Sequence, residues 1–257
     1  MSSLTQDADP GVALSLRRVG KQYAVDTGSL PVLDRVTLDL QRGEFLSIVG
    51  ASGCGKSTLL RLIVGLDDDF EGEILIDGKP VDGPGLERGM VFQDHRLFPW
   101  LSVQDNIGLG LDSFDLSQRE RRSRINDMVK LVGLTGFSQA YPHQLSGGMA
   151  QRAAIARALV SEPAILLMDE PFGALDSLTR LYLQEELLRI WSERRVTVIV
   201  VTHDVEEAIF LSDTIAVMEP RPGRIQDMLQ VDLARPRNRA LPAFGALKNR
   251  ILEQLRR

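Results

Sequence analysis

The stretch FLSIVGASGCGKSTLLRLIVGL, residues 45–66, joins an apolar run to a glycine-rich loop and a second apolar segment with helical spacing. In its centre Gly50, Gly55, Lys56 and Ser57 match the pattern G-x-x-x-x-G-K-[ST]. The candidate nucleotide-binding residues of this loop are Gly50, Ala51, Ser52, Gly53, Cys54, Gly55, Lys56, Ser57 and Thr58. In such a loop, glycines let successive N–H groups turn toward one point, and the following helix adds the positive end of its dipole. The stretch therefore predicts a strand, a phosphate-binding loop and a helix, with Lys56 on the β- and γ-phosphates of a nucleotide and Ser57 on Mg²⁺.

Further apolar runs of strand length follow at 165–168, 196–201 and 214–218. They have the continuous apolar character of strands buried on both faces, and helical segments lie between several of them. Residues 32–40 differ, because Val36, Leu38 and Leu40 recur with a period of two, as in a half-buried strand. Residues 26–31 (DTGSLP) are predicted as a loop. The pattern predicts an α/β fold with a mostly parallel core sheet.

The middle of the chain has no buried-strand run between Phe92 and Ile165. Residues 117–132 begin with the capping-box pair Ser117 and Glu120, and continue with apolar residues on one helical face. We therefore predict a helical subdomain at about residues 95–157, inserted into a domain of residues 12–235. Residues 1–11 are expected to be a flexible tail, and residues 236–257 a basic C-terminal helix or tail.

Composition narrows the function classes. The formal net charge of −5 gives no electrostatic reason to expect nucleic-acid binding. Cys54 is the single cysteine, so an intrachain disulfide is not possible. The N-terminus lacks the pattern of a signal peptide, and no apolar run reaches the roughly 20 residues that span a bilayer. We expect a soluble chain that reaches a membrane only through a partner.

Two acidic residues end the apolar run at 165–168. An aspartate at the end of a buried strand is the usual partner of a phosphate-binding loop, where it holds Mg²⁺, and Asp169 fits that role. Glu170 follows, and a carboxylate there accepts a proton from an attacking water or orients it.

A second glycine pair stands in HQLSGGMAQR, residues 143–152. The Ser146 hydroxyl and the N–H groups of Gly147 and Gly148 would form another anion site at the start of a helix. One chain needs only one triphosphate site, so this second one is explained if it serves a nucleotide held by another subunit.

With these motifs the sequence resembles the ATP-binding subunits of ABC transporters from about residue 14 to 225, and LSGGM at 145–149 resembles their signature motif. The resemblance implies a P-loop NTPase fold of the ABC type, with an N-terminal antiparallel β part and an inserted helical subdomain. It also implies a head-to-tail homodimer, in which Ser146, Gly147 and Gly148 act on the ATP bound by the other subunit.

The resemblance assigns further roles. Tyr23 matches the aromatic residue that stacks on adenine, with a core tyrosine as the alternative. Gln93 matches the glutamine that contacts Mg²⁺ and the attacking water, Asp176 the D-loop aspartate, and His203 the histidine at the γ-phosphate. Position 149 departs from the family, because methionine stands where glutamine is usual.

One nucleotide module without a membrane segment is typical of an importer subunit. The stretch QDHRLFPWLSVQDNIGLGL, 93–111, is similar to the nitrate, sulfonate and taurine importer group. This similarity implies two integral-membrane permease subunits, a periplasmic or extracellular solute-binding protein acting indirectly, and a peripheral position at the cytoplasmic face of a bacterial inner membrane. The expected solute is an oxyanion, with aliphatic sulfonate preferred over nitrate and taurine. Phe98 and Trp100 are expected near the permease contact, or packed inside the helical subdomain.

The sequence leaves other functions open. A soluble ABC ATPase acting with nucleic acid or a regulatory partner is the alternative from another class, although the acidic composition argues against a nucleic-acid partner. A phosphotransferase would leave LSGGM unexplained, and a GTPase would need an N-K-x-D motif. The C-terminal segment has Phe244, Leu247, Ile251 and Leu255 on one helical face, which fits a membrane contact, a dimer contact or packing on its own domain.

Overall fold

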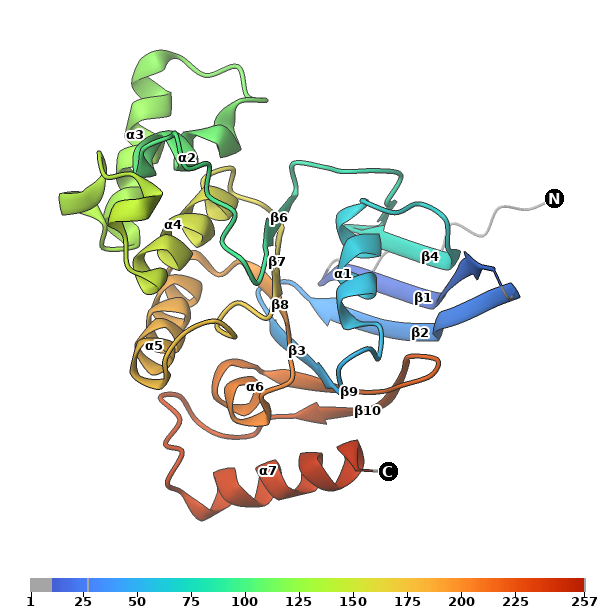
Figure 1. Cartoon of the computed structure of the whole chain (residues 1–257). Helices are drawn as coiled ribbons and strands as arrows, with labels where there is room; N and C mark the ends of the chain where they lie inside the picture. The colour runs from blue at the N-terminus through green and yellow to red at the C-terminus, as the bar shows by residue number, and fades with distance from the viewer. Residues whose placement is uncertain (1–10, 27, 257) are drawn as a thin grey trace. The chain divides into compact units, whose positions relative to one another are not determined.

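The computed structural model describes residues 11–26 and 28–256, so the predicted tail lies, apart from Gly11, outside the described residues. The chain divides into two compact units (Figure 1). The first unit comprises Met1–Gly85 and Val201–Arg257, and the second comprises Leu86–Val200. No helix within residues 11–26 and 28–256 combines the length and the apolar character needed to cross a membrane.

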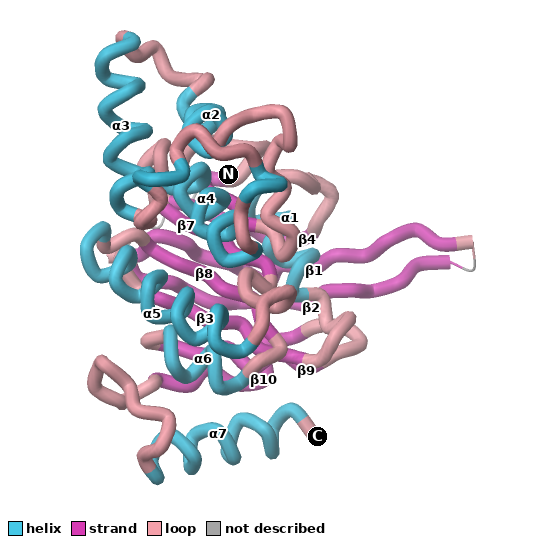
Figure 2. The backbone as a smooth tube through the Cα atoms, turned by 60° about the vertical axis from the view of Figure 1, so that its left-hand side comes forward, coloured by secondary structure: helices cyan, strands magenta, loops and turns pink. Residues whose placement is uncertain are grey.

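An antiparallel sheet forms one part of the first unit, with strand order β2-β1-β4-β5. Its strands are β1 (Val12–Val25), β2 (Gly28–Gln41), β4 (Glu71–Ile76) and β5 (Lys79–Pro80). In β2, residues Val36, Leu38 and Leu40 are buried while their neighbours are exposed, which confirms the half-buried strand predicted there. The loop predicted at 26–31 is wrong, because Gly28–Pro31 pair with β1 in a long hairpin that projects from the unit (Figure 2).

The strand, glycine-rich loop and helix predicted at residues 45–66 lie in the other part of this unit. Strand β3 (Phe45–Gly50) is buried throughout and pairs in parallel with β9 (Thr214–Glu219), with Gly50 opposite Met218. Strand β10 (Arg224–Gln230) pairs antiparallel with β9. The helices of the unit are α1 (Lys56–Val64), α6 (Val205–Leu211) and α7 (Pro242–Leu255). The strand and helix predicted on either side of the glycine-rich loop are thus confirmed.

The second unit combines parallel strands with most of the helices. Strand β6 (Arg88–Val91) pairs in parallel with β7 (Ile165–Asp169), and β8 (Thr197–Thr202) continues from this unit into the first. Its helices are α2 (Val103–Gly108), α3 (Gln118–Leu131), α4 (Gly147–Leu159) and α5 (Ser177–Arg194), with single 3₁₀ turns at Leu109–Leu111, Thr135–Phe137 and Pro142–Gln144. The capping box of Ser117 and Glu120 starts α3 as predicted. Parallel strand pairs, an antiparallel sheet and interspersed helices confirm the predicted fold class.

The C-terminal segment packs on its own unit. Helix α7 buries Phe244 and Ile251, and Lys248 forms an ion pair with Glu206 in the first turn of α6. Arg237, 6% exposed, donates hydrogen bonds to backbone carbonyls at the end of α6 and beyond it, including Ile209 at 2.7 Å. Burial lowers the pKa of Arg237 to about 10, so its guanidinium keeps its charge at neutral pH.

We expect Arg237→Met to lower the free energy of unfolding by about 2–4 kcal/mol, because buried carbonyls lose their donor. Arg250→Met is the matched control. Arg250 lies in the same segment, but it is exposed and its ion pair with Asp227 is long, at 3.7 Å. That substitution should change the free energy by less than about 1 kcal/mol. Urea unfolding followed by circular dichroism measures both, and equal effects would contradict a supporting role for Arg237.

Candidate functional site

The glycine-rich loop connects the end of β3 at Gly50 to the start of α1 at Lys56. Gly53 and Gly55 have φ angles of 78° and 97°, which L-residues with side chains rarely adopt. Gly55 is the N-cap of α1 and supplies no side-chain hydrogen bond, and the positive end of the helix dipole lies at this loop. These features fit a phosphate-binding loop.

Lys56 is folded back over this loop. Its side chain is 5% exposed, and Nζ donates to the backbone oxygens of Gly50 at 2.8 Å and Ala51 at 3.1 Å. The ammonium group is therefore held against the first residues of the loop, and its contact with phosphates stays a prediction.

Cys54 packs under the same loop. A Cβ placed on Gly50 would come within 2.6 Å of the Cys54 sulfur, so glycine is required at position 50 for this packing. Burial raises the pKa of the Cys54 thiol, which keeps it protonated at neutral pH. Its role is that of a small buried side chain, which agrees with the interpretation of the loop as a binding element.

His203 follows the end of β8 and is exposed. The helix after it is capped by its neighbour: Asp204 accepts hydrogen bonds from the backbone N–H groups of Glu206 and Glu207, at 2.9 and 3.1 Å. The local turn is thus explained by Asp204, and the catalytic role of His203 stays a prediction.

Tyr23 lies half-buried on β1. Its hydroxyl donates to Asp67 at 3.2 Å, and Lys21 lies over its ring with Nζ 4.8 Å from the ring centroid. Lys21 in turn forms an ion pair with Asp67 at 2.8 Å. These contacts hold the ring in place, and its stacking on adenine stays a prediction.

In the second unit, the residues predicted at the attacking water come together. Asp169 is the last residue of β7, and Glu170 follows with a φ angle of 42°, a conformation that residues with side chains rarely adopt. A Cβ placed on Gly173 would lie 3.3 Å from Nε2 of Gln93 and 3.7 Å from Oε2 of Glu170. Gln93 and Glu170 are therefore neighbours around Gly173.

The second glycine pair begins α4. Ser146 is its N-cap and accepts a hydrogen bond from the Met149 N–H at 3.3 Å. A Cβ on Gly148 would lie 2.7 Å from a methyl group of Thr179, so this glycine also permits close packing of α4 against α5. The structure thus gives Gly148 a local role beside the predicted action on another subunit's nucleotide, which stays a prediction.

Asp176 is the N-cap of α5 and accepts hydrogen bonds from the N–H groups of Leu178 at 3.2 Å and Thr179 at 3.1 Å. Hydrogen bonds from Thr179 and then Leu178 lower the pKa of this carboxyl group. The aspartate thus has a structural role, and its D-loop role stays a prediction.

Two residues that sequence reasoning missed, the half-buried Arg157 and the buried Asn106, hold the segment after Gln93. Arg157 on α4 donates to the carbonyls of Arg96 at 2.8 Å and His95 at 3.1 Å, and burial lowers its pKa. Asn106 on α2 accepts from the Phe98 N–H at 2.8 Å and donates to the carbonyls of Phe98, Leu101 and Ser102. A basic residue within the apolar run of α4 was the available signal for Arg157.

The segment that Arg157 and Asn106 hold presents aromatic side chains to the surface. Trp100 is 69% exposed, Phe98 is also exposed, and their ring centroids are 5.4 Å apart. The alternative that these rings pack inside the helical subdomain is wrong.

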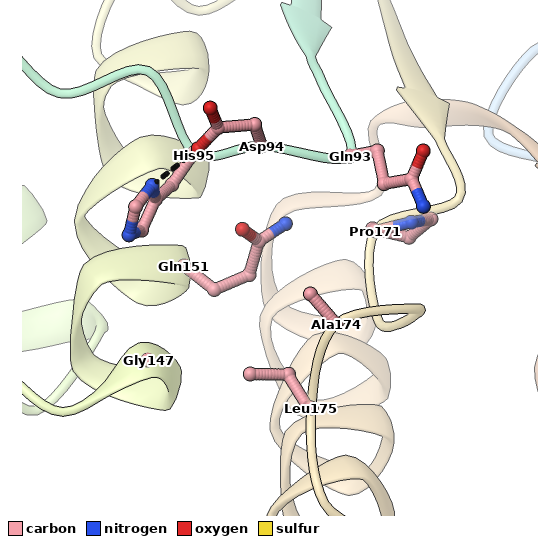
Figure 3. A pocket seen from close by; sticks show the side chains of 8 residues that line it. All are labelled: Gln93, Asp94, His95, Gly147, Gln151, Pro171, Ala174 and Leu175. Carbon is pink, nitrogen blue, oxygen red and sulfur yellow. Dashed lines mark hydrogen bonds and ion pairs between the residues drawn. The ribbon is translucent and has the colours of Figure 1, made fainter.

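A pocket of about 330 Å³ lies in the second unit, beside Gln93 (Figure 3). Its lining comprises Gln93, Asp94, His95, Gly147, Gln151, Pro171, Ala174 and Leu175. The loop after β6, helix α4 and the segment after Glu170 therefore meet around one cavity.

Comparison with known proteins adds to this geometry. The family described as "ABC transporter" matches residues 33–173. The chain is 46% identical to an aliphatic sulfonates import ATP-binding protein, SsuB, of Bacillus thuringiensis subsp. konkukian, over 95% of this chain and 96% of that protein. It is also 46% identical to SsuB of Bacillus subtilis, over 95% and 93% of the two chains. A dimeric ATP-binding cassette solved in a post-hydrolysis state with ADP and Pi is 35% identical, with a TM-score of 0.74 over 85% of this chain and 98% of that one.

Proposed function

Because the chain belongs to the ABC transporter family, we propose that it is the ATP-hydrolysing subunit of an importer of oxyanionic solutes, with an aliphatic sulfonate as the solute. The observation that carries this proposal is the glycine-rich loop between β3 and α1, in a chain similar over almost its whole length to sulfonate import ATP-binding proteins.

The residues divide the chemistry of hydrolysis between them. Lys56 and the N–H groups of residues 50–58 bind the phosphates. Glu170 accepts a proton from the attacking water, Gln93 orients that water, and His203 contacts the γ-phosphate. Tyr23 stacks on the adenine.

Magnesium is the metal expected with ATP. The hydroxyl of Ser57, the amide oxygen of Gln93 and the carboxylate of Asp169 would hold it, and oxygen ligands of this kind suit Mg²⁺. When bound, the ion neutralises charge on the phosphates. The position of Asp169 at the end of β7 supports this assignment.

Two copies of the chain act together. We propose that Ser146, Gly147 and Gly148 at the start of α4, with Asp176, complete the site on the partner subunit. The dimeric form of a similar cassette supports this arrangement. The two chains bind two permease subunits at the cytoplasmic face of the cell membrane, and a solute-binding protein delivers the solute from outside. No nucleic acid takes part.

The exposed aromatic pair is the proposed contact with the permease. We expect a tagged Glu170→Gln chain, with Mg-ATP, to recover a multi-spanning permease from detergent-solubilised membranes. The further change Trp100→Ser should reduce the recovered permease several-fold, because it removes a large exposed apolar side chain. Tyr182→Ser, at another exposed aromatic residue, is the control and should not reduce it.

Recovery of a soluble or nucleic-acid partner, with no permease, would overturn the transport function and favour the soluble ABC ATPase. The solute is tested separately, by comparing uptake of labelled ethanesulfonate, taurine and nitrate in cells with and without the gene. Loss of nitrate uptake alone would replace sulfonate as the solute, and loss of taurine uptake alone would replace a simple alkanesulfonate with this amino-substituted one.

A further inference from the structure

The pocket beside Gln93 contains a buried amide that the fold does not explain. Gln151 on α4 is 3% exposed, and its Nε2 atom has no hydrogen-bond partner among the described residues. A buried polar group without a partner costs free energy, so most such groups are hydrogen-bonded. Other buried amides of the same unit follow that rule: Asn106 makes four hydrogen bonds, and Gln184, 2% exposed, has a partner.

The Gln151 side chain points into the pocket. Figure 3 shows its amide projecting from α4 into the pocket, toward the loop that carries Gln93 and Asp94. Asp94 has one carboxylate oxygen 2.9 Å from Nδ1 of His95. Gln93 lines the same pocket as Gln151, and its side-chain oxygen is an acceptor of the kind that the Gln151 amide N–H groups need.

The other end of this loop is already attached to α4. Arg157, on the same helix as Gln151, holds the carbonyls of His95 and Arg96. The Gln93 side chain instead rests against Gly173, beside Glu170. The His95–Arg96 end of the loop is thus hydrogen-bonded to α4. The Gln93 end instead contacts the segment around Gly173, on the other side of the pocket.

We propose that Gln151 is a positioning residue for Gln93. When ATP binds, the Gln151 Nε2 atom donates a hydrogen bond to the side-chain oxygen of Gln93, and this bond sets Gln93 relative to the attacking water. Because α4 also begins with Ser146–Gly148, the bond links the helix that acts on the partner's nucleotide to the glutamine of its own site. The inference rests on the proposed ATP hydrolysis and adds to it a residue that lies outside the LSGGM motif at 145–149.

The proposal predicts opposite effects on stability and activity. Gln151→Met keeps the length of the side chain but removes the amide, so the nucleotide-free protein should have a Tm equal to or above that of the wild type. The same variant should lower kcat about tenfold, the size of one lost hydrogen bond, with KM for ATP unchanged. A purely structural glutamine would give a lower Tm with kcat unchanged.

The experiment compares steady-state Mg-ATP hydrolysis and nucleotide-free thermal unfolding for three proteins. These are the wild type, Gln151→Met and the control Gln184→Met, which replaces a buried glutamine that has a partner and should lower Tm without lowering kcat. A double-mutant cycle adds Gln93→Ala, in whose background Gln151→Met should have no further effect on kcat.

An unchanged kcat in Gln151→Met, or an equal loss in the Gln93→Ala background, would overturn the positioning role while leaving the proposed function intact. A fall of Tm like that of Gln184→Met would likewise overturn it, by showing that the amide is paired in the resting protein. A wild-type protein without ATP hydrolysis would instead overturn the proposed function, and this inference with it.

Discussion

Glu170→Gln is expected to lower kcat for ATP hydrolysis by about 10²–10⁴-fold, the range typical of a lost general base. Glu170 follows directly on β7 with a positive φ angle, and its carboxylate lies beside Gln93 around Gly173. Glutamine has the same shape but cannot accept the proton of the attacking water. Because the glycine-rich loop is untouched, the affinity for ATP should stay within about twofold of the wild-type value.

Two measurements test this expectation: phosphate release under saturating Mg-ATP, and equilibrium titration with ATP. Glu185→Gln, an exposed carboxylate on α5, is the matched control and should leave both values unchanged. Turnover at the wild-type rate in Glu170→Gln would remove this residue from the mechanism. A parallel loss of ATP affinity would indicate a role in binding instead.

Lys56→Met is expected to lower the affinity for ATP by about 10²-fold or more, the usual size of the loss when a buried, hydrogen-bonded charge is removed from a binding site. The Lys56 side chain is almost completely buried and already contacts the backbone of residues 50 and 51. Methionine retains the apolar stem but not the charge that the phosphates need.

Lys79→Met provides the comparison, because Lys79 is exposed on β5 and outside the loop. Calorimetric titration with ATP should show binding to this control and to the wild type, and little or none to Lys56→Met. Wild-type affinity in Lys56→Met would mean that the glycine-rich loop is not the nucleotide site, whatever the family relationship.

The fold was predictable where its signal is local. The burial of β3, the alternation in β2 and the capping box of α3 follow from the spacing of a few neighbouring residues. The hairpin at 28–31 was missed, because its Gly, Ser and Pro residues favour turns, while pairing with β1 makes them a strand.

The site was predictable to the extent that its motifs are contiguous. What the sequence could not provide are contacts between segments far apart in the chain. Arg157 holds carbonyls 61 and 62 residues away, and the Gly148 backbone approaches Thr179 on another helix. Likewise, the apolar face of α7 was visible, but its partner α6 was not, because periodicity shows which side of a helix is buried and not against what.

Because the Cys54 thiol is buried, its reaction with an added reagent reports opening of the loop of residues 50–55. A maleimide reacts with the thiolate, and this thiol is both covered and held in its protonated form by its surroundings. Alkylation then has to wait until the loop of residues 50–55 opens, so its rate reports how often the folded protein exposes this segment. Since the sequence contains one cysteine, the signal comes from a single position without any engineering.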